Sequence, residues 1–312
     1  MKLVTILIPC FNEEQSLPFL HDALQKLMQE NEQYQWQLLF VDDGSKDNTL
    51  SILKRLAAGD PRYTYVSLSR NFGKENAMLA GFDYAKGDCM VIMDADLQHP
   101  PQLIPEMLRY WEEGYQDVYA KRKDRNTDSW LRKRLSNWYY QILQKTTRVD
   151  ILRNVGDFRL LDRQCINAMK SLRESERYTK GMYCWIGFKK KEILFEPAER
   201  IAGESTFSYG RLISLAMEGF TSFTTAPLKI STAVGVFVSL LSFILMFIFL
   251  IKAILYGDPV QGFPTLITVI LFLGGIQLLS LGIIGEYLGR IFIETKNRPV
   301  YLVKETNLRN ED

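Results

Sequence analysis

The chain has 312 residues, of which 47% are hydrophobic and 24% are charged, so it can form a full-sized domain core and a further module. Its formal net charge is only +2, which argues against a nucleic-acid partner. The four cysteines form no C-x-x-C pair, and we expect them to be reduced and structural. Residues 1–9 contain too short an apolar run for a secretory signal, so we expect a first strand and a cytoplasmic domain.

Strand and helix patterns alternate through the first hundred residues. Strands are predicted at residues 4–8, 37–41, 63–68 and 90–93, and helices at about residues 17–29, 50–58 and 75–85. We expect Ser16 to cap the first helix, with Pro18 at its start. This alternation predicts an α/β fold with a mostly parallel sheet and helices on both faces.

Polar residues follow the ends of these predicted strands. The second strand ends at Asp42 and Asp43, and the fourth ends at Asp94 and Asp96, shortly before Pro100. In an open α/β sheet, ligands bind at the carboxyl ends of the strands, so we expect these residues to share one crevice.

Asp94, Asp96 and Gln98 offer the hard oxygen ligands that Mg²⁺ or Mn²⁺ prefers. A metal ion held there would bind a diphosphate. The alternative interpretation is a surface turn whose aspartates cap the next helix, and the D-x-D tripeptide alone does not decide between the two.

Two apolar stretches near the C-terminus, residues 230–251 and 259–285, contain no charged residue, and each is long enough to span a bilayer. The segment that connects them, residues 256–264, has no Lys or Arg, whereas basic residues flank the pair. By the positive-inside rule, both ends of this hairpin face the cytoplasm, which predicts a multi-pass inner-membrane protein. Buried core helices are the alternative. Glycines in the second span are compatible with packing into a homo-oligomer.

Two further segments have patterns typical of a membrane surface. Residues 121–134 contain seven basic and two acidic residues, which indicates either a solvated face or attraction to anionic lipid headgroups. Residues 207–223 have near-helical apolar spacing, which fits an interfacial helix or packing against the soluble domain.

Three motifs resemble the GT-A fold of family 2 glycosyltransferases: residues 9–13, Asp42-Asp43-Gly44-Ser45 and Asp94-Ala95-Asp96-Leu97-Gln98. His99-Pro100-Pro101 and residues 199–205 narrow the resemblance to the polyprenyl-phosphate glycosyltransferases, in their bacterial two-helix branch. The Q-x-x-R-W motif of processive polysaccharide synthases is absent from the sequence. The resemblance implies a GT-A catalytic domain (1–202), amphipathic juxtamembrane helices (203–229), a transmembrane hairpin (230–289) and a cytoplasmic tail (290–312). It covers nearly the whole chain, and only for residues 300–312 do we argue no counterpart in the family.

The resemblance also implies roles on the donor side of the site. A nucleotide sugar would be bound by residues of the strand-end loops and their neighbours: Pro9, Phe11, Glu13, Asp42, Asp43, Lys74 and Asp94. A divalent metal would be held by Asp94, Asp96 and Gln98, with Asp96 counted as catalytic. For Lys74, an ordinary surface lysine in the first turn of a helix is the alternative interpretation.

On the acceptor side, the resemblance assigns the lipid phosphate or the diphosphate to Arg122, Arg134, Arg200 and Ser205. It makes Asp157, in the stretch 154–163, the candidate catalytic base or orienting group. A phosphate monoester has a second pKa near 6, so the acceptor needs little deprotonation at neutral pH. The alternative is a structural aspartate that caps a turn or pairs with Arg159.

The resemblance therefore implies inverting, metal-dependent transfer of glucose from UDP-glucose to polyprenyl phosphate at the cytoplasmic membrane face. GlcNAc, galactose, mannose or aminoarabinose donors are alternatives that the sequence does not separate. An inactive membrane scaffold and a nucleotidyltransferase are alternatives from other classes, and the intact acidic motifs and the hairpin argue against them.

Overall fold

The computed structural model describes residues 1–122, 155–175, 177–196 and 262–308, together with some positions between 228 and 251. The chain divides into two compact units. The first combines residues 1–215 with residues 298–312, and the second consists of residues 216–297. The predicted domain boundaries at residues 202 and 229 fall outside the described residues, so they stay predictions.

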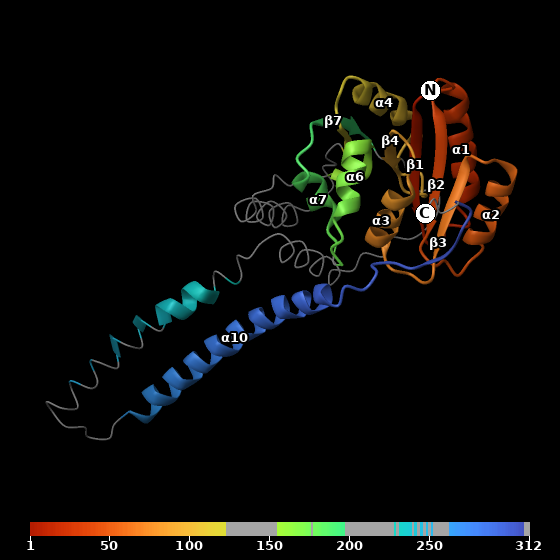
Figure 1. Cartoon of the computed structure of the whole chain (residues 1–312). Helices are drawn as coiled ribbons and strands as arrows, with labels where there is room; N and C mark the ends of the chain where they lie inside the picture. The colour runs from red at the N-terminus through yellow and green to blue at the C-terminus, as the bar shows by residue number, and fades with distance from the viewer. Residues whose placement is uncertain are drawn as a thin grey trace. The chain divides into compact units, whose positions relative to one another are not determined.

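The described part of the first unit is built on one eight-stranded sheet with the order β7-β5-β6-β4-β1-β2-β3-β8 (Figure 1). Its strands are β1 (Leu3–Cys10), β2 (Gln35–Asp42), β3 (Tyr63–Leu68), β4 (Cys89–Ile92), β5 (Asp117–Arg122), β6 (Val155–Asp162), β7 (Lys190–Phe195) and β8 (Val303–Thr306). The four strands predicted from the sequence are β1 to β4, and they pair in parallel with one another.

Helices cover both faces of this sheet, and their bounds are α1 (Leu17–Glu30), α2 (Thr49–Gly59), α3 (Lys74–Tyr84), α4 (Ile104–Glu112), α6 (Arg163–Ser171) and α7 (Thr179–Trp185), with a 3-10 turn η1 (Pro101–Leu103). Side chains alternate along a strand, so β1 presents Ile6 and Leu7 to opposite sides. Ile6 joins the core cluster that contains α1 and α4 residues, whereas Leu7 lies against Gly81 of α3. The predicted mostly parallel sheet with helices on both faces is confirmed.

The predicted cap of the first helix is wrong in one detail. Ser16 does occupy the position before α1, and Pro18 lies in the first turn, but the Ser16 side chain caps no backbone N–H. Its hydroxyl instead donates a hydrogen bond to Glu13 Oε2 at 2.5 Å. Ser16 has helical backbone angles, φ −83° and ψ −33°, instead of the extended angles that aim an N-cap oxygen at the first N–H groups, so its hydroxyl serves the loop that precedes the helix.

The sheet becomes mixed at β6, which runs antiparallel to both β4 and β5. The pairing of β4 with β6 sets Ile92 opposite Arg159. No strand was predicted for the residues of β5, β6, β7 or β8. Strand β8 pairs antiparallel with β3, so residues from the predicted cytoplasmic tail complete the edge of the sheet.

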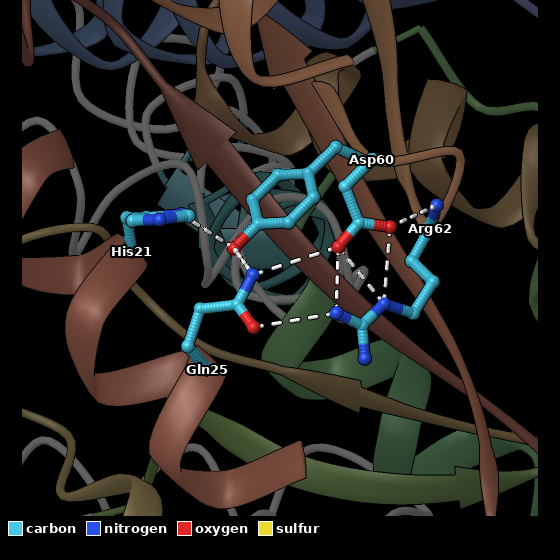
Figure 2. Close-up of polar contacts among 5 residues, drawn as sticks. His21, Gln25, Asp60 and Arg62 are labelled. Atoms are coloured by element: carbon cyan, nitrogen blue, oxygen red, sulfur yellow. Dashed lines mark hydrogen bonds and ion pairs between the residues drawn. The ribbon is translucent and has the colours of Figure 1, made fainter. Parts of the chain in front are cut away.

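A polar network at the amino end of β3 ties this strand to α1, and Figure 2 shows it in close-up. Arg62 binds the Asp60 carboxylate through Nε and Nη2, and the Gln25 side chain contacts both residues. His21 Nδ1 lies 2.7 Å from the Tyr63 hydroxyl. A groove of about 610 Å³ is lined by Gln25 and Arg62 among others. It lies toward the amino ends of the strands, away from the predicted site.

The second unit contains α10 (Phe263–Thr295), a 33-residue helix. By its length and composition, the segment Phe272–Thr295 within it is long and apolar enough to cross a membrane. Large apolar side chains of α10 such as Leu278 are exposed, as expected for a helix that faces lipid. The helix continues past residue 289, where the hairpin was predicted to end. The described positions between 228 and 251 are also helical.

Candidate active site

Lys74 connects the two aspartates that the sequence analysis assigned to opposite sides of the reaction. Its ammonium nitrogen lies 2.6 Å from Asp94 Oδ1 and 3.1 Å from Asp157 Oδ2. It is the first residue of α3, where it could have been an ordinary surface lysine. The structure instead places it in an acidic cluster that combines the end of β4, the start of α3 and β6.

The register of the sheet explains why Asp157 reaches this cluster. Successive pairs along β4 and β6 run from Cys89 opposite Asp162 to Ile92 opposite Arg159. Continuing an antiparallel register by two residues on each strand would set Asp94 opposite Asp157. The two ion pairs of Lys74 agree with that placement. The alternative pairing of Asp157 with Arg159 is not what the structure shows, because Arg159 binds Asp117.

Burial and charge act against each other in this cluster. Burial alone would raise the pKa of Asp157, but the Lys74 ammonium, with smaller contributions from Lys180 and Arg159, holds it below its usual value. The Lys74 side chain is 42% exposed, and Asp157 and Asp94 together raise its pKa against the desolvation of its ammonium group in the cluster. Both groups are therefore charged at neutral pH. Among the described residues, Asp157 Oδ1 has no hydrogen-bond partner.

The turn that carries Asp94 and Asp96 is fixed by local hydrogen bonds. Leu97 has a positive φ of 56°, and the Gln98 N–H donates to Asp96 Oδ1 at 3.1 Å. The Asp94 N–H donates to His99 Nδ1 at 3.1 Å, so this nitrogen carries no proton and the neutral ring has its proton on Nε2. Burial of His99 lowers its pKa, and its ring stacks on the ring of Phe158 with the two ring centroids 4.8 Å apart.

The carboxylates after β2 are buried and accept hydrogen bonds from the protein itself. Asp42 accepts from the Ser45 N–H at 3.0 Å and from the Ser67 hydroxyl at 2.8 Å. Asp43 accepts from the N–H groups of Phe72 and Gly73, at 2.7 and 2.9 Å. Burial raises the pKa of Asp43, against the lowering effect of these two donors. Both carboxylates thus hold neighbouring loops in place.

The loop after β1 joins the same edge of the sheet. Pro9 and Cys10 pair with Val41 and Asp42, so the two loops begin side by side. Phe11 is exposed. Burial raises the pKa of Glu13, although its hydrogen bond from Ser16 acts in the opposite direction.

A second group of buried polar residues packs around β6 and its neighbouring helices. Arg159 Nη1 lies 3.1 Å from Asp117 Oδ2, and the Arg159 guanidinium stacks 3.6 Å from the Tyr183 ring centroid. Glu75, next to Lys74, accepts hydrogen bonds from the backbone N–H and the hydroxyl of Thr179. These contacts tie α3 and α7 to the strand that carries Asp157. Ser67, Glu75, His99 and Thr179 were not predicted as parts of the site, and only His99 belonged to a motif.

The structure brings together a subset of the predicted site residues. Lys74, Asp94 and Asp157 are in direct contact, and Asp96 and Gln98 share the turn with Asp94. Arg122 is exposed at the end of β5. Arg134, Arg200 and Ser205 lie outside the described residues. The roles of all these residues stay predictions.

The donor set of this turn fits a divalent cation. Two carboxylates and an amide come from one short segment, and the Lys74 ammonium shows that Asp94 already accepts a cationic partner. Within the described ranges, no group of three or more His, Cys, Asp and Glu side chains is placed to hold a metal. A protein that supplies one or two carboxylates, with substrate phosphates and water completing the coordination, is the usual pattern for Mg²⁺.

Comparison with known proteins defines the class of this chain. Residues 5–169 match the Glycosyl transferase family 2, which is more than half of the chain. The chain belongs to this family and is a glycosyltransferase. Residues 226–291 match the GtrB C-terminal hairpin, which places the chain in the branch with a C-terminal hairpin and confirms the family resemblance drawn from the sequence.

Relatives match over nearly the whole chain. A putative glycosyltransferase of Bacillus subtilis (strain 168), CsbB, is 46% identical over 310 residues, which cover 99% of this chain and 94% of the relative. The SfII prophage-derived bactoprenol glucosyl transferase of Shigella flexneri is 42% identical over 307 residues, covering 98% and 99%. A prophage bactoprenol glucosyl transferase homolog of Escherichia coli (strain K12) is 41% identical over 301 residues, covering 96% and 98%.

Proposed function

We propose that this glycosyltransferase moves glucose from UDP-glucose to polyprenyl phosphate with inversion at the anomeric carbon. The observation that carries the proposal is the bridge formed by Lys74, which joins the metal-side Asp94 to the acceptor-side Asp157. In a direct displacement, the residues that hold the diphosphate and the residue that acts on the acceptor must lie on either side of one sugar ring. The relatives named as bactoprenol glucosyl transferases support both the acceptor and the sugar.

In the proposed reaction, a phosphate oxygen of the acceptor attacks the anomeric carbon while the bond from that carbon to the UDP oxygen breaks. One carbon–oxygen bond replaces another on the opposite face of the sugar, and UDP leaves with the electron pair. Because the phosphate monoester is largely a dianion at neutral pH, no proton has to be removed first.

Asp157 then acts through its charge and position. A general base works best when its pKa is close to the working pH, whereas Lys74 keeps the pKa of Asp157 low. An ionised carboxylate beside the anomeric carbon stabilises the positive charge that develops there. This favours the orienting and electrostatic role of Asp157 over the role of a proton acceptor.

On the donor side, we propose that Pro9, Phe11, Glu13 and Asp42 surround the nucleobase and that Asp43 lies beside the sugar nucleotide. Asp94, Asp96 and Gln98 would hold Mg²⁺ or Mn²⁺, which supplies Lewis-acid charge at the departing diphosphate. Lys74 places one more positive charge beside Asp94. We propose that Arg122, Arg134, Arg200 and Ser205 bind the acceptor phosphate or the diphosphate.

The decisive assay incubates the purified protein with undecaprenyl phosphate and a panel of UDP- and GDP-linked sugars, with and without a chelator. We expect glucosyl lipid from UDP-glucose, loss of product in excess chelator, and loss of product in Asp96→Ala. If another nucleotide sugar is turned over faster than UDP-glucose, that sugar replaces glucose as the proposed donor, and the proposed reaction class stays the same. Full activity in chelator would remove the metal from the mechanism, and no transfer from any donor would favour the scaffold.

We also propose that the chain crosses the inner membrane twice, with both termini in the cytoplasm. The first unit contains residues from both before and after residues 216–297. A chain that leaves a soluble unit and returns to it must cross a membrane an even number of times, which a single span cannot do. Tags at residues 1 and 312 should be protected in right-side-out vesicles, and a tag in residues 256–263 should be accessible. An accessible C-terminal tag would contradict this topology.

A further inference from the structure

Residues 301–308, which we call the C-terminal strap, contact β3 along its whole length. At the carboxyl end of β3, Val303 pairs with Leu68 and the Ser69 N–H donates to Leu302 O at 2.8 Å. At the amino end, Asn307 Oδ1 accepts from the Tyr65 N–H at 2.7 Å, and Asn307 Nδ2 donates to Tyr63 O at 3.1 Å. The strap therefore has a near end beside the candidate site and a far end remote from it.

The strap is also attached through side chains, with Glu305 and Thr306 between these two ends and Tyr301 just before the near end. Lys54 Nζ of α2 lies 2.6 Å from Glu305 Oε2, and the Thr306 hydroxyl donates to Tyr65 O at 2.7 Å. Tyr301 donates its hydroxyl to Asp83 Oδ2 at 2.5 Å, and Arg173 binds the same carboxylate through both terminal nitrogens. A four-residue strand would pair weakly by itself, so these contacts fix it in place.

The near end lies where the donor-side loop begins. Residues 70–73 follow Ser69 directly, and the N–H groups of Phe72 and Gly73 hold the Asp43 carboxylate. The same loop packs against Gly44, where an added Cβ would come within 2.4 Å of the Arg70 carbonyl carbon. Lys74 is the next residue. The loop thus connects the strap to Asp43 and Lys74 within a few residues.

We infer that the near end of the C-terminal strap, at Leu302 and Val303, positions residues 69–73 and through them the donor-side carboxylate Asp43. The inference rests on the proposed function for the role of Asp43 as part of the donor site. Leu302 and Val303 are positioning residues, because they act through the loop and do not reach the acidic cluster themselves.

The physical reason is that β3 without β8 would be an open edge strand. Its last backbone groups would pair with water, and the loop after it would lose its fixed start. Donor affinity falls in proportion to the fraction of molecules whose loop is correctly placed. The register between β3 and β8 already shifts between Ser67 and Leu68, so few ladder contacts hold this end.

The test compares the two ends of the strap in the full-length protein. Val303→Pro removes a backbone N–H and distorts the pairing at the near end. Asn307→Ala removes both side-chain hydrogen bonds at the far end. Lys304→Thr is the matched control, because the Lys304 side chain is exposed and threonine favours a strand. Thermal melts report whether each variant loosens the strap.

The first readout is hydrogen exchange in the peptide that contains Phe72 and Gly73, which needs no ligand. We expect faster exchange there in Val303→Pro and exchange like the parent in the other two variants. The second readout is steady-state kinetics with UDP-glucose and undecaprenyl phosphate. If one molecule in ten keeps the loop in place, the KM for UDP-glucose rises about tenfold in Val303→Pro, with a small change in kcat.

Exchange and KM like the parent in Val303→Pro, together with a lowered melting temperature, would overturn the inference, because the strap would then be structural only. Equal increases in KM for Val303→Pro and Asn307→Ala would overturn it as well. If the unaltered protein does not use UDP-glucose, the proposed donor is wrong. The hydrogen-exchange comparison still decides whether the strap positions the loop.

Discussion

Replacing Asp117 by alanine should destabilise the first unit more than any surface substitution. Asp117 is fully buried and Arg159 is 2% exposed, and two nitrogen–oxygen distances of 3.1 and 3.3 Å join their side chains. Removal of the carboxylate leaves the guanidinium buried with a single carbonyl acceptor, Gly156 O, among the described residues. Breaking one partner of such a pair costs about 3–5 kcal/mol.

For a unit of this size, that loss corresponds to a fall in melting temperature of roughly 6–20 °C. The measurement is a thermal melt of the detergent-solubilised protein followed by circular dichroism. Glu30→Ala is the matched control, because it removes the exposed ion pair with Lys26, whose nitrogen and oxygen are 3.8 Å apart. An exposed pair of this kind contributes about 0–1 kcal/mol.

The double variant Asp117→Leu/Arg159→Met tests the reason for the effect. It removes both charges and keeps apolar volume, so most of the lost stability should return. A loss below about 1 kcal/mol in Asp117→Ala would refute the reasoning, because even a buried neutral hydrogen bond costs that much to break. So would a double variant that is no more stable than the single one.

Three further predictions concern the site. Asp157→Asn should lower turnover by orders of magnitude with donor affinity nearly unchanged in calorimetry; lost donor binding or a collapsed melting temperature would return Asp157 to a structural role. Because burial holds the pKa of His99 below its unfolded value of 6.5, the folded protein binds fewer protons and its free energy of unfolding should fall as the pH drops below 6.5. In His99→Asn, the Asn Oδ1 can replace Nδ1 as acceptor, and the free energy of unfolding should fall less as the pH drops. Parallel curves of unfolding free energy against pH for the parent and this variant would contradict the prediction. Gly44→Ala should cost at least about 1–2 kcal/mol, since φ is +68° and a Cβ would meet backbone, whereas Gly59→Ala, with open space around it, should not destabilise.

The strands that could be predicted from the sequence are those with a local signal. Residues 4–8 and 90–93 are apolar runs that end at Pro9 and Asp94, so their type and the position of the D-x-D turn were both predictable. Lys74 was also recognised at the start of its helix. Its two partners were not predictable together, because they depend on contacts between distant parts of the chain.

The antiparallel placement of β6 beside β4 had no signature in the sequence. Strand order is decided by the packing of the whole sheet, and it is the pairing of Ile92 with Arg159 and the two ion pairs of Lys74 that place Asp157 near Asp94. Ser16 had a local signal for capping, but its backbone adopts helical angles and its hydroxyl donates to Glu13 instead. Strand β8 contains Lys304 and Glu305 in four residues, a composition that is typical of a solvated tail.

The return of the chain to the sheet at β8 makes residues 216–297 an insertion within the first unit. A soluble version that simply stops before residue 216 would therefore lack one strand. The exposed edge of β3 would then invite pairing between molecules and aggregation. Joining residue 215 to residue 298 through a flexible Gly/Ser linker would keep β8 in the same chain. A soluble version of this protein should therefore omit the internal residues 216–297 and retain the C-terminal residues.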